Sequence, residues 1–159
     1  MRPGPEQWTC YMEQALALAR RAAALGEVPV GALVVKDGQV IGRGYNRRET
    51  DADATAHAEM LAIREACRSL ERWRLEGCTL FVTLEPCPMC TGAILQSRLS
   101  QVVFGAFDPR SGCCGSRLSL TEVEGFDAHP ALYGGVLERE CAELLQEFFA
   151  RRRGSPEAR

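Results

Sequence analysis

The stretch Thr79-Leu80-Phe81-Val82-Thr83-Leu84-Glu85-Pro86-Cys87-Pro88-Met89-Cys90 decides the fold that we expect for this chain. Its first half is apolar and rich in β-formers, which predicts a buried strand over residues 78–84. Glu85-Pro86 ends that strand, because proline cannot donate to a strand ladder. Proline is well tolerated in the first turn of a helix, so a short helix is predicted over residues 88–97.

A strand–helix–strand unit follows, because a further strand is predicted over residues 101–107. Two strands joined through a helix lie parallel with a right-handed crossover. Upstream, the helical spacing of apolar residues predicts a helix over 6–25. Two strands are predicted over 30–35 and 39–45, and the Asp37-Gly38 pair between them is a strong hairpin signal.

A second long helix is expected over residues 55–73, with Thr55 as its N-cap. The stretch 120–135 is expected to be irregular, and a last helix is predicted over 136–153. This alternation of helices and strands indicates a layered α/β domain. We expect one domain over residues 1–153 and a disordered tail over 154–159.

Composition restricts the possible partners of this chain of 159 residues. Its net charge is -2, so any contact with nucleic acid must come from a local basic patch. No apolar run approaches the ~20 residues that a membrane helix requires. No secretory signal is recognised at the start, so we expect the eight cysteines to be reduced thiols or metal ligands in a cytoplasmic protein.

Four residues in two motifs carry the chemistry that we predict: His57, Glu59, Cys87 and Cys90. Catalytic zinc sites hold the metal with three protein ligands and keep a fourth position for water. The carboxylate of Glu59 is then free to move protons. Residues two apart on a regular helix point away from each other, so the start of the helix must present His57 and Glu59 to one cavity.

Three simpler interpretations compete with a catalytic zinc site. The Cys-x-x-Cys pair could be a redox pair, or half of a closed structural zinc site. A closed site needs a fourth ligand, for which Cys113, Cys114 and His129 are the candidates. His57 alone could be a helix-start histidine. The joint occurrence of His-x-Glu and Pro-Cys-x-x-Cys favours the signature of zinc nucleobase deaminases.

The motifs also carry a family resemblance that extends from about residue 8 to residue 153. Residues 55–60, 83–90 and 102–106 resemble the cytidine/deoxycytidylate deaminase superfamily. Within it, the chain resembles the bacterial tRNA-specific adenosine deaminases at Glu27-Val28-Pro29-Val30-Gly31-Ala32, at Asn46, and at Phe148-Phe149 followed by Arg151-Arg152-Arg153.

The resemblance implies a three-layer α/β/α cytidine-deaminase-like fold with a mixed central sheet. It also implies a zinc-dependent hydrolase that deaminates adenosine to inosine at the wobble position of a tRNA anticodon loop, releasing ammonia. One Zn²⁺ per chain would be held by His57, Cys87 and Cys90, with Glu59 as the catalytic proton carrier. The implied assembly is a homodimer.

Further residues are assigned to the substrate on the same basis. The resemblance places Asn46 against the nucleoside, and the position of Ala58 at the helix start suggests that its backbone N–H binds substrate. Arg151, Arg152 and Arg153 would touch RNA phosphates, or would simply form a solvated basic helix end.

The stretch Asp127-Ala128-His129-Pro130 departs from the family pattern, in which Phe-Asn-His precedes a short strand. Pro130 would interrupt a strand there. The departure keeps open a deaminase of free bases or small nucleosides, for example guanine or cytosine. A non-catalytic binding module stabilised by zinc is the third possibility, although such a module has no use for Glu59.

Overall fold

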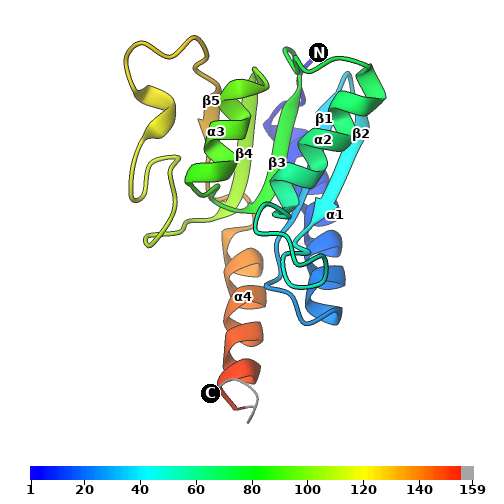
Figure 1. Ribbon diagram of the computed structural model, residues 1–159, viewed down its shortest axis with the longest axis vertical. Coiled ribbons are helices and arrows are strands. Elements are labelled where there is room, and N and C mark those ends of the chain that lie inside the picture. Colours follow the sequence, from blue (N-terminus) through cyan, green and yellow to red (C-terminus); the bar gives the residue numbers. More distant parts are fainter. Residues whose placement is uncertain (155–159) are drawn as a thin grey trace.

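The computed structural model describes residues 1–154, and the tail predicted to be disordered lies outside the described residues from position 155 onward. One five-stranded sheet with the strand order β2-β1-β3-β4-β5 is accompanied by four α-helices and one 3₁₀ helix, η1 (Figure 1). In chain order the elements are α1 (Pro5–Ala24), β1 (Gly31–Lys36), β2 (Gln39–Tyr45), α2 (Ala58–Leu70), β3 (Thr79–Leu84), α3 (Pro88–Gln96), β4 (Gln101–Ala106), η1 (Leu120–Glu122), β5 (Ala131–Tyr133) and α4 (Glu138–Arg153).

The sheet is mixed, as predicted. Strand β1 pairs antiparallel with both β2 and β3, whereas β3–β4 and β4–β5 are parallel pairs. The predicted hairpin between β1 and β2 is confirmed, and its two turn residues, Asp37 and Gly38, have φ values of 48° and 77°. Positive φ at both central residues is the geometry that matches the twist of the flanking strands.

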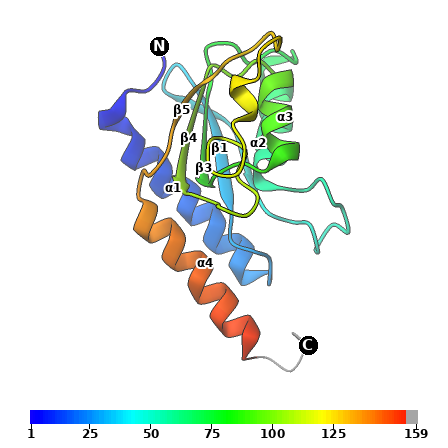
Figure 2. The ribbon, with the colours of Figure 1, turned by 90° about the vertical axis from the view of Figure 1, so that its left-hand side faces the viewer.

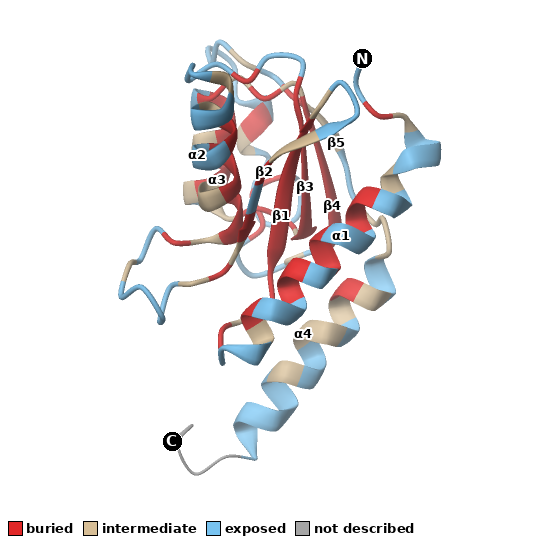
Figure 3. Cartoon of the chain, turned by 90° about the vertical axis from the view of Figure 1, so that its right-hand side faces the viewer, coloured by how far each residue is buried: buried red, intermediate tan, exposed pale blue. Residues whose placement is uncertain are grey.

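Helices cover both faces of the sheet and complete the three predicted layers. Helices α1 and α4 lie on one face, and α2 and α3 on the other (Figures 2 and 3). Each face has its own apolar core, and the alternating side chains of the central strands divide between the two. Within the described residues, no helix is both long and apolar enough to cross a bilayer.

The expectation of an irregular stretch over 120–135 is wrong, because this stretch contains η1 and the strand β5. Pro130 does not interrupt β5, because the strand begins one residue later, at Ala131. The backbone N–H of Ala131 then donates to the carbonyl of Ser100 at 3.0 Å. Strand β5 lies at the sheet edge, where a proline before the first paired residue costs no ladder hydrogen bond.

Helix α2 begins at Ala58, so the predicted N-cap at Thr55 is wrong. The carboxylate of Asp53 accepts hydrogen bonds from the backbone N–H and hydroxyl of Thr55, at 2.8 and 2.7 Å. This local turn competes with helical hydrogen bonding and holds Thr55 outside the helix. His57 is the N-cap, with φ -76° and ψ 152°. The other predicted bounds differ from the observed ones by at most two residues, except at the end of α2.

Candidate metal centre and active site

The three predicted metal ligands come together at the ends of two helices. His57 is the N-cap of α2, Cys87 is the N-cap of α3, and Cys90 lies in the first turn of α3. Both helices begin at the same end of the sheet (Figure 1). The Nδ1 atom of His57 lies 3.6 Å from the Sγ atoms of both Cys87 and Cys90. One donor atom of each residue lies within 4.8 Å of the other two.

These separations fit a tetrahedral zinc ion. Zinc bonds of about 2.0 Å to nitrogen and 2.3 Å to sulfur, set at the tetrahedral angle, place the two donor atoms ~3.5 Å apart. The observed distances from His57 to the two sulfur atoms, 3.6 Å each, are close to that value. One imidazole and two thiols are also the donor set that zinc prefers.

The three candidate fourth ligands of a closed structural site are engaged elsewhere. The Sγ atom of Cys113 donates to the carbonyl of Ser111 at 3.5 Å. The Sγ atom of Cys114 lies 3.7 Å from the hydroxyl of Thr91, and Nδ1 of His129 lies 2.9 Å from the carbonyl of Thr121. Within residues 1–154 no further His, Cys, Asp or Glu joins the group. This contradicts a closed four-ligand site.

The extended backbone of His57 allows His57 and Glu59 to face one cavity, although they are only two residues apart. The cavity has a volume of about 200 Å³. A close approach fixes the start of α2, since a Cβ atom on Gly44 of β2 would lie 2.3 Å from the carbonyl oxygen of Ala58. The lining residues are Val28, Val30, Asn46, Arg48, His57, Ala58, Glu59, Leu84, Glu85, Cys87, Asp108 and Ser111.

Burial and mutual hydrogen bonds control the protonation of the ionisable side chains in and beside the cavity. Glu59 is 4% exposed, and desolvation raises the pKa of its carboxyl to about 7. A hydrogen bond from the Cys90 thiol lowers the pKa of Cys87 to about 4, whereas the pKa of Cys90 is raised by the same bond and by burial. Cys90 would coordinate zinc as its thiolate, because a coordinating thiol is deprotonated outright.

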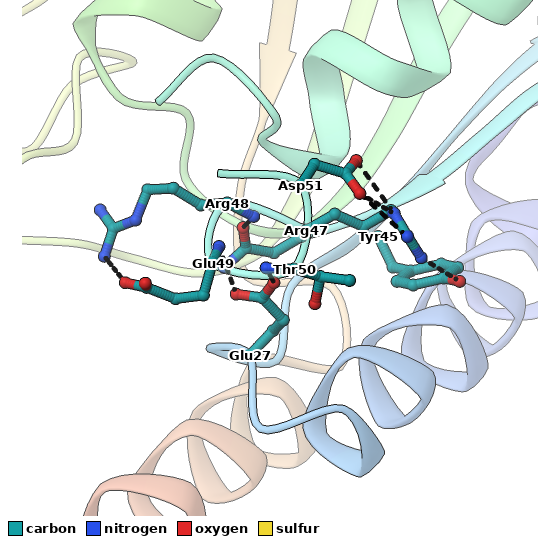
Figure 4. Close-up of polar contacts among 8 residues, drawn as sticks. Glu27, Tyr45, Arg47, Arg48, Glu49, Thr50 and Asp51 are labelled. Atoms are coloured by element: carbon teal, nitrogen blue, oxygen red, sulfur yellow. Dashed lines mark hydrogen bonds and ion pairs between the residues drawn. The ribbon is translucent and has the colours of Figure 1, made fainter. Parts of the chain in front are cut away.

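Asn46 is buried at the rim of the cavity, where backbone groups fix the orientation of its amide. Its Nδ2 atom donates to the carbonyl of Val28 at 3.2 Å, and its Oδ1 atom accepts from the N–H of Arg48 at 3.1 Å. The adjoining loop is held by Glu27, whose carboxylate accepts from the N–H groups of Glu49 and Thr50 at 3.1 and 2.7 Å (Figure 4).

The opposite wall of the cavity is the loop over residues 108–116, and Glu85 anchors it. The Glu85 carboxylate is 2% exposed and accepts from the N–H groups of Asp108, Cys114 and Ser116, at 3.1, 3.1 and 3.0 Å. It also accepts from the Ser116 hydroxyl. A Cβ atom on Gly112 would lie 2.3 Å from the Glu85 carboxyl carbon, so the loop packs tightly against this anchor.

Sequence reasoning missed two site residues, Glu27 and Glu85. Both belong to stretches that carry the family resemblance, but the sequence did not indicate that they anchor the loops beside the cavity. A glutamate directly after a buried strand, as at Glu85, was available as a signal. Its backbone partners lie 23 to 31 residues away along the chain, and no local pattern identifies them.

We expect Glu85→Ala to lower the free energy of unfolding by about 2–4 kcal/mol, because it leaves several buried N–H groups without an acceptor. Urea denaturation of the full chain measures this change. Glu85→Gln keeps the shape and one acceptor oxygen, and we expect it to cost less than the alanine variant. Equal stability of Glu85→Ala and the unchanged protein would contradict the anchoring role.

The three C-terminal arginines lie apart from the cavity. Arg151, Arg152 and Arg153 are exposed in the last turn of α4 and do not line the cavity. Helix α4 extends beyond the sheet at the end where the cavity lies (Figures 1 and 2). The arginines therefore lie at the tip of a protruding helix.

The fold and the site together define the class of zinc-dependent deaminases, and comparison with known proteins agrees with this class. Residues 5–106 match the family of the cytidine and deoxycytidylate deaminase zinc-binding region, and the chain belongs to that family. It is 52% identical over 139 residues to the tRNA-specific adenosine deaminase of Bacillus subtilis (strain 168), covering 87% of this chain and 86% of that protein. It is 46% identical to the tRNA-specific adenosine deaminase of Haemophilus influenzae, covering 89% and 83% of the two chains.

Two solved structures show the same fold. One comes from a study of A-to-I editing by tRNA:A34 deaminases at the wobble position of transfer RNA. It superimposes with a TM-score of 0.83 at 44% identity, over 86% of this chain and 99% of that one. The other is a guanine deaminase from Nitrosomonas europaea, with a TM-score of 0.73 at 26% identity, over 92% and 85% of the two chains.

Proposed function

We propose that this protein is a zinc-dependent hydrolase that deaminates adenosine to inosine at the wobble position of a tRNA anticodon loop. The observation that carries the proposal is the 52% identity to a tRNA-specific adenosine deaminase over 87% of the chain. Identity to the guanine deaminase is only 26%. A tRNA substrate is therefore favoured over a free base.

His57, Cys87 and Cys90 would hold the zinc ion, which as a Lewis acid lowers the pKa of water at the site. Glu59 holds and moves the proton. Its raised pKa of about 7 suits both acceptance from the attacking water and delivery to the departing ammonia. Burial keeps bulk water from competing as a proton acceptor at this carboxyl.

The cavity of about 200 Å³ suits a single base rather than a stacked helix. A base must leave its stack to enter, and a single-stranded loop allows this at low cost. We assign nucleoside contacts to the amide of Asn46 and to the backbone N–H of Ala58. Ala58 is the first residue of α2, where backbone N–H groups have no partner within the helix.

Partner contacts belong to the same proposal. Arg151, Arg152 and Arg153 carry positive charge in the exposed last turn of α4 and would contact phosphates. A cytoplasmic location agrees with eight cysteines that form no disulfide in the described chain.

A homodimer is supported by exposed apolar side chains around η1, with Leu118, Val123 and Phe126 exposed by 58%, 44% and 42%. A solution mass of one chain, measured by light scattering, would contradict it.

Ammonia release from four substrates tests the function: an anticodon stem-loop with a wobble adenosine, adenosine, guanine and cytosine. We expect release from the stem-loop alone, because the RNA flanking the flipped base supplies most of the binding energy. Release from a free base alone would contradict the tRNA assignment, and no release at all would contradict an enzyme.

The triple variant Arg151→Gln/Arg152→Gln/Arg153→Gln is expected to raise KM for the stem-loop and to leave kcat unchanged.

A further inference from the structure

A second cavity, of about 480 Å³, lies where α1, β2 and α2 meet at the sheet edge. We call it the arginine pocket, because five arginines line it: Arg21 of α1, Arg43 of β2, Arg47, and Arg64 and Arg68 of α2. Glu65 is its only acidic lining residue. Such a concentration of positive charge contrasts with the net charge of -2 of the whole chain.

Most of this charge has no partner. Within residues 1–154, no carboxylate lies within 4.0 Å of the guanidinium of Arg21, Arg43, Arg64 or Arg68. Among these five arginines, Arg47 alone forms an ion pair within the described residues, with Asp51. Subtracting Asp51 and Glu65 from the five arginines leaves three uncompensated positive charges.

Folding does not explain this arrangement. Arg64 and Arg68 are four residues apart on α2, a spacing at which like charges destabilise a helix. A charged side chain on an edge strand protects the edge from aggregation, but this accounts for Arg43 alone. The other four arginines come from outside β2, so their convergence on one cavity indicates an anionic ligand.

One wall of the arginine pocket is rigidly built (Figure 4). The Nε atom of Arg47 donates to both carboxylate oxygens of Asp51 at 3.1 Å, and Nη2 donates to Oδ1 at 2.9 Å. Its Nη1 atom donates to the Tyr45 hydroxyl at 3.1 Å. The guanidinium of Arg21 lies 5.0 Å from the centre of the Tyr45 ring. These contacts fix the wall, whereas the charge available to a phosphate comes from the arginines without an ion-pair partner.

The arginine pocket and the catalytic cavity share this wall. Tyr45 and Arg47 line the arginine pocket, whereas Asn46 and Arg48 line the catalytic cavity. The single segment of residues 45–48 thus contributes lining side chains to both cavities. The two cavities therefore border each other across this segment, which places the arginine pocket next to the cavity that would take the base.

We propose that the arginine pocket binds backbone phosphates of the RNA whose adenosine enters the catalytic cavity. The inference rests on the proposed function, and it adds a second contact surface to the catalytic end of the molecule. Guanidinium groups bind phosphate oxygens through paired hydrogen bonds, and such contacts position RNA without reading its sequence. The pocket therefore adds affinity and orientation, not base specificity.

The test compares two triple variants of the zinc-loaded full chain. Arg43→Gln/Arg64→Gln/Arg68→Gln removes unpaired charges of the arginine pocket. Arg2→Gln/Arg72→Gln/Arg74→Gln is the matched control, because it removes three exposed arginines that line neither cavity. Equilibrium binding of a fluorescent anticodon stem-loop and of whole tRNA is measured at several salt concentrations.

We expect the pocket variant to bind RNA at least about tenfold more weakly, with the slope of log affinity against log salt reduced by about two. The control should stay within about twofold of the unchanged protein. The kcat at saturating RNA should not change, because the pocket does not touch the reacting atoms. Thermal unfolding of both variants checks that the fold persists.

Unchanged affinity and salt slope in the pocket variant would overturn the inference, and so would an equal loss in the control. Weakening of whole tRNA alone would place the contact outside the anticodon stem-loop and overturn the inference. RNA binding without ammonia release would contradict the proposed function but leave the arginine pocket intact. Ammonia release from the RNA, together with unaltered RNA binding by the pocket variant, would contradict the role of the arginine pocket but leave the proposed function intact.

Discussion

Replacing Glu59 with alanine lowers turnover of the RNA substrate by about 10²–10⁴-fold, as expected when a positioned proton carrier is removed. The carboxyl is buried in the catalytic cavity, and desolvation raises its pKa to about 7. Zinc content stays at about one ion per chain, because the proposed ligands His57, Cys87 and Cys90 are unchanged. Ammonia release and metal analysis of the same preparation measure both quantities.

Two further variants make this result specific to proton transfer. Glu59→Gln keeps the shape of the side chain and removes its acid–base function, so we expect the same loss of turnover. Glu76→Ala removes an exposed glutamate outside the cavity and should leave turnover and zinc unchanged. Loss of zinc from the Glu59 variants would identify Glu59 as a ligand and contradict the role assigned to it.

Replacing Cys90 with alanine removes one of three zinc ligands, and we expect loss of both the metal and all turnover. A ligand held at 1,000 times its dissociation constant stabilises the folded state by about 4 kcal/mol. For a chain of 159 residues this corresponds to a fall of about 8–16 °C in Tm. Differential scanning calorimetry and metal analysis of the purified variant measure the two effects.

Cys114→Ala is the matched control for the loss of a buried thiol. Cys114 is 7% exposed and its sulfur faces Thr91, outside the ligand group. We expect this variant to keep zinc and turnover, with a modest loss of stability from the lost packing. Zinc retained by Cys90→Ala, or lost from Cys114→Ala, would show that the ligand set is different.

Local sequence predicted the elements wherever one local preference dominated. The Asp37-Gly38 turn and the proline-started helix α3 agree with the structure because both follow backbone restrictions of single residues. Prediction failed where local and tertiary preferences competed. Thr55 is a good N-cap residue, but the side chain of Asp53 holds it in a turn. Strand β5 exists because Ser100 and its neighbours in β4 offer backbone partners to a stretch with little strand character of its own.

Short motifs were enough to name the candidate chemical groups, because donor atoms and their spacing are properties of local sequence. His57, Glu59, Cys87 and Cys90 could be named from two such motifs. The packing of distant segments leaves the group without a fourth protein ligand among residues 1–154, since it engages Cys113, Cys114 and His129 elsewhere. It also decided which charges meet. The arginine pocket brings together arginines from positions 21 to 68. Side chains so distant along the chain converge only when α1, β2 and α2 pack together.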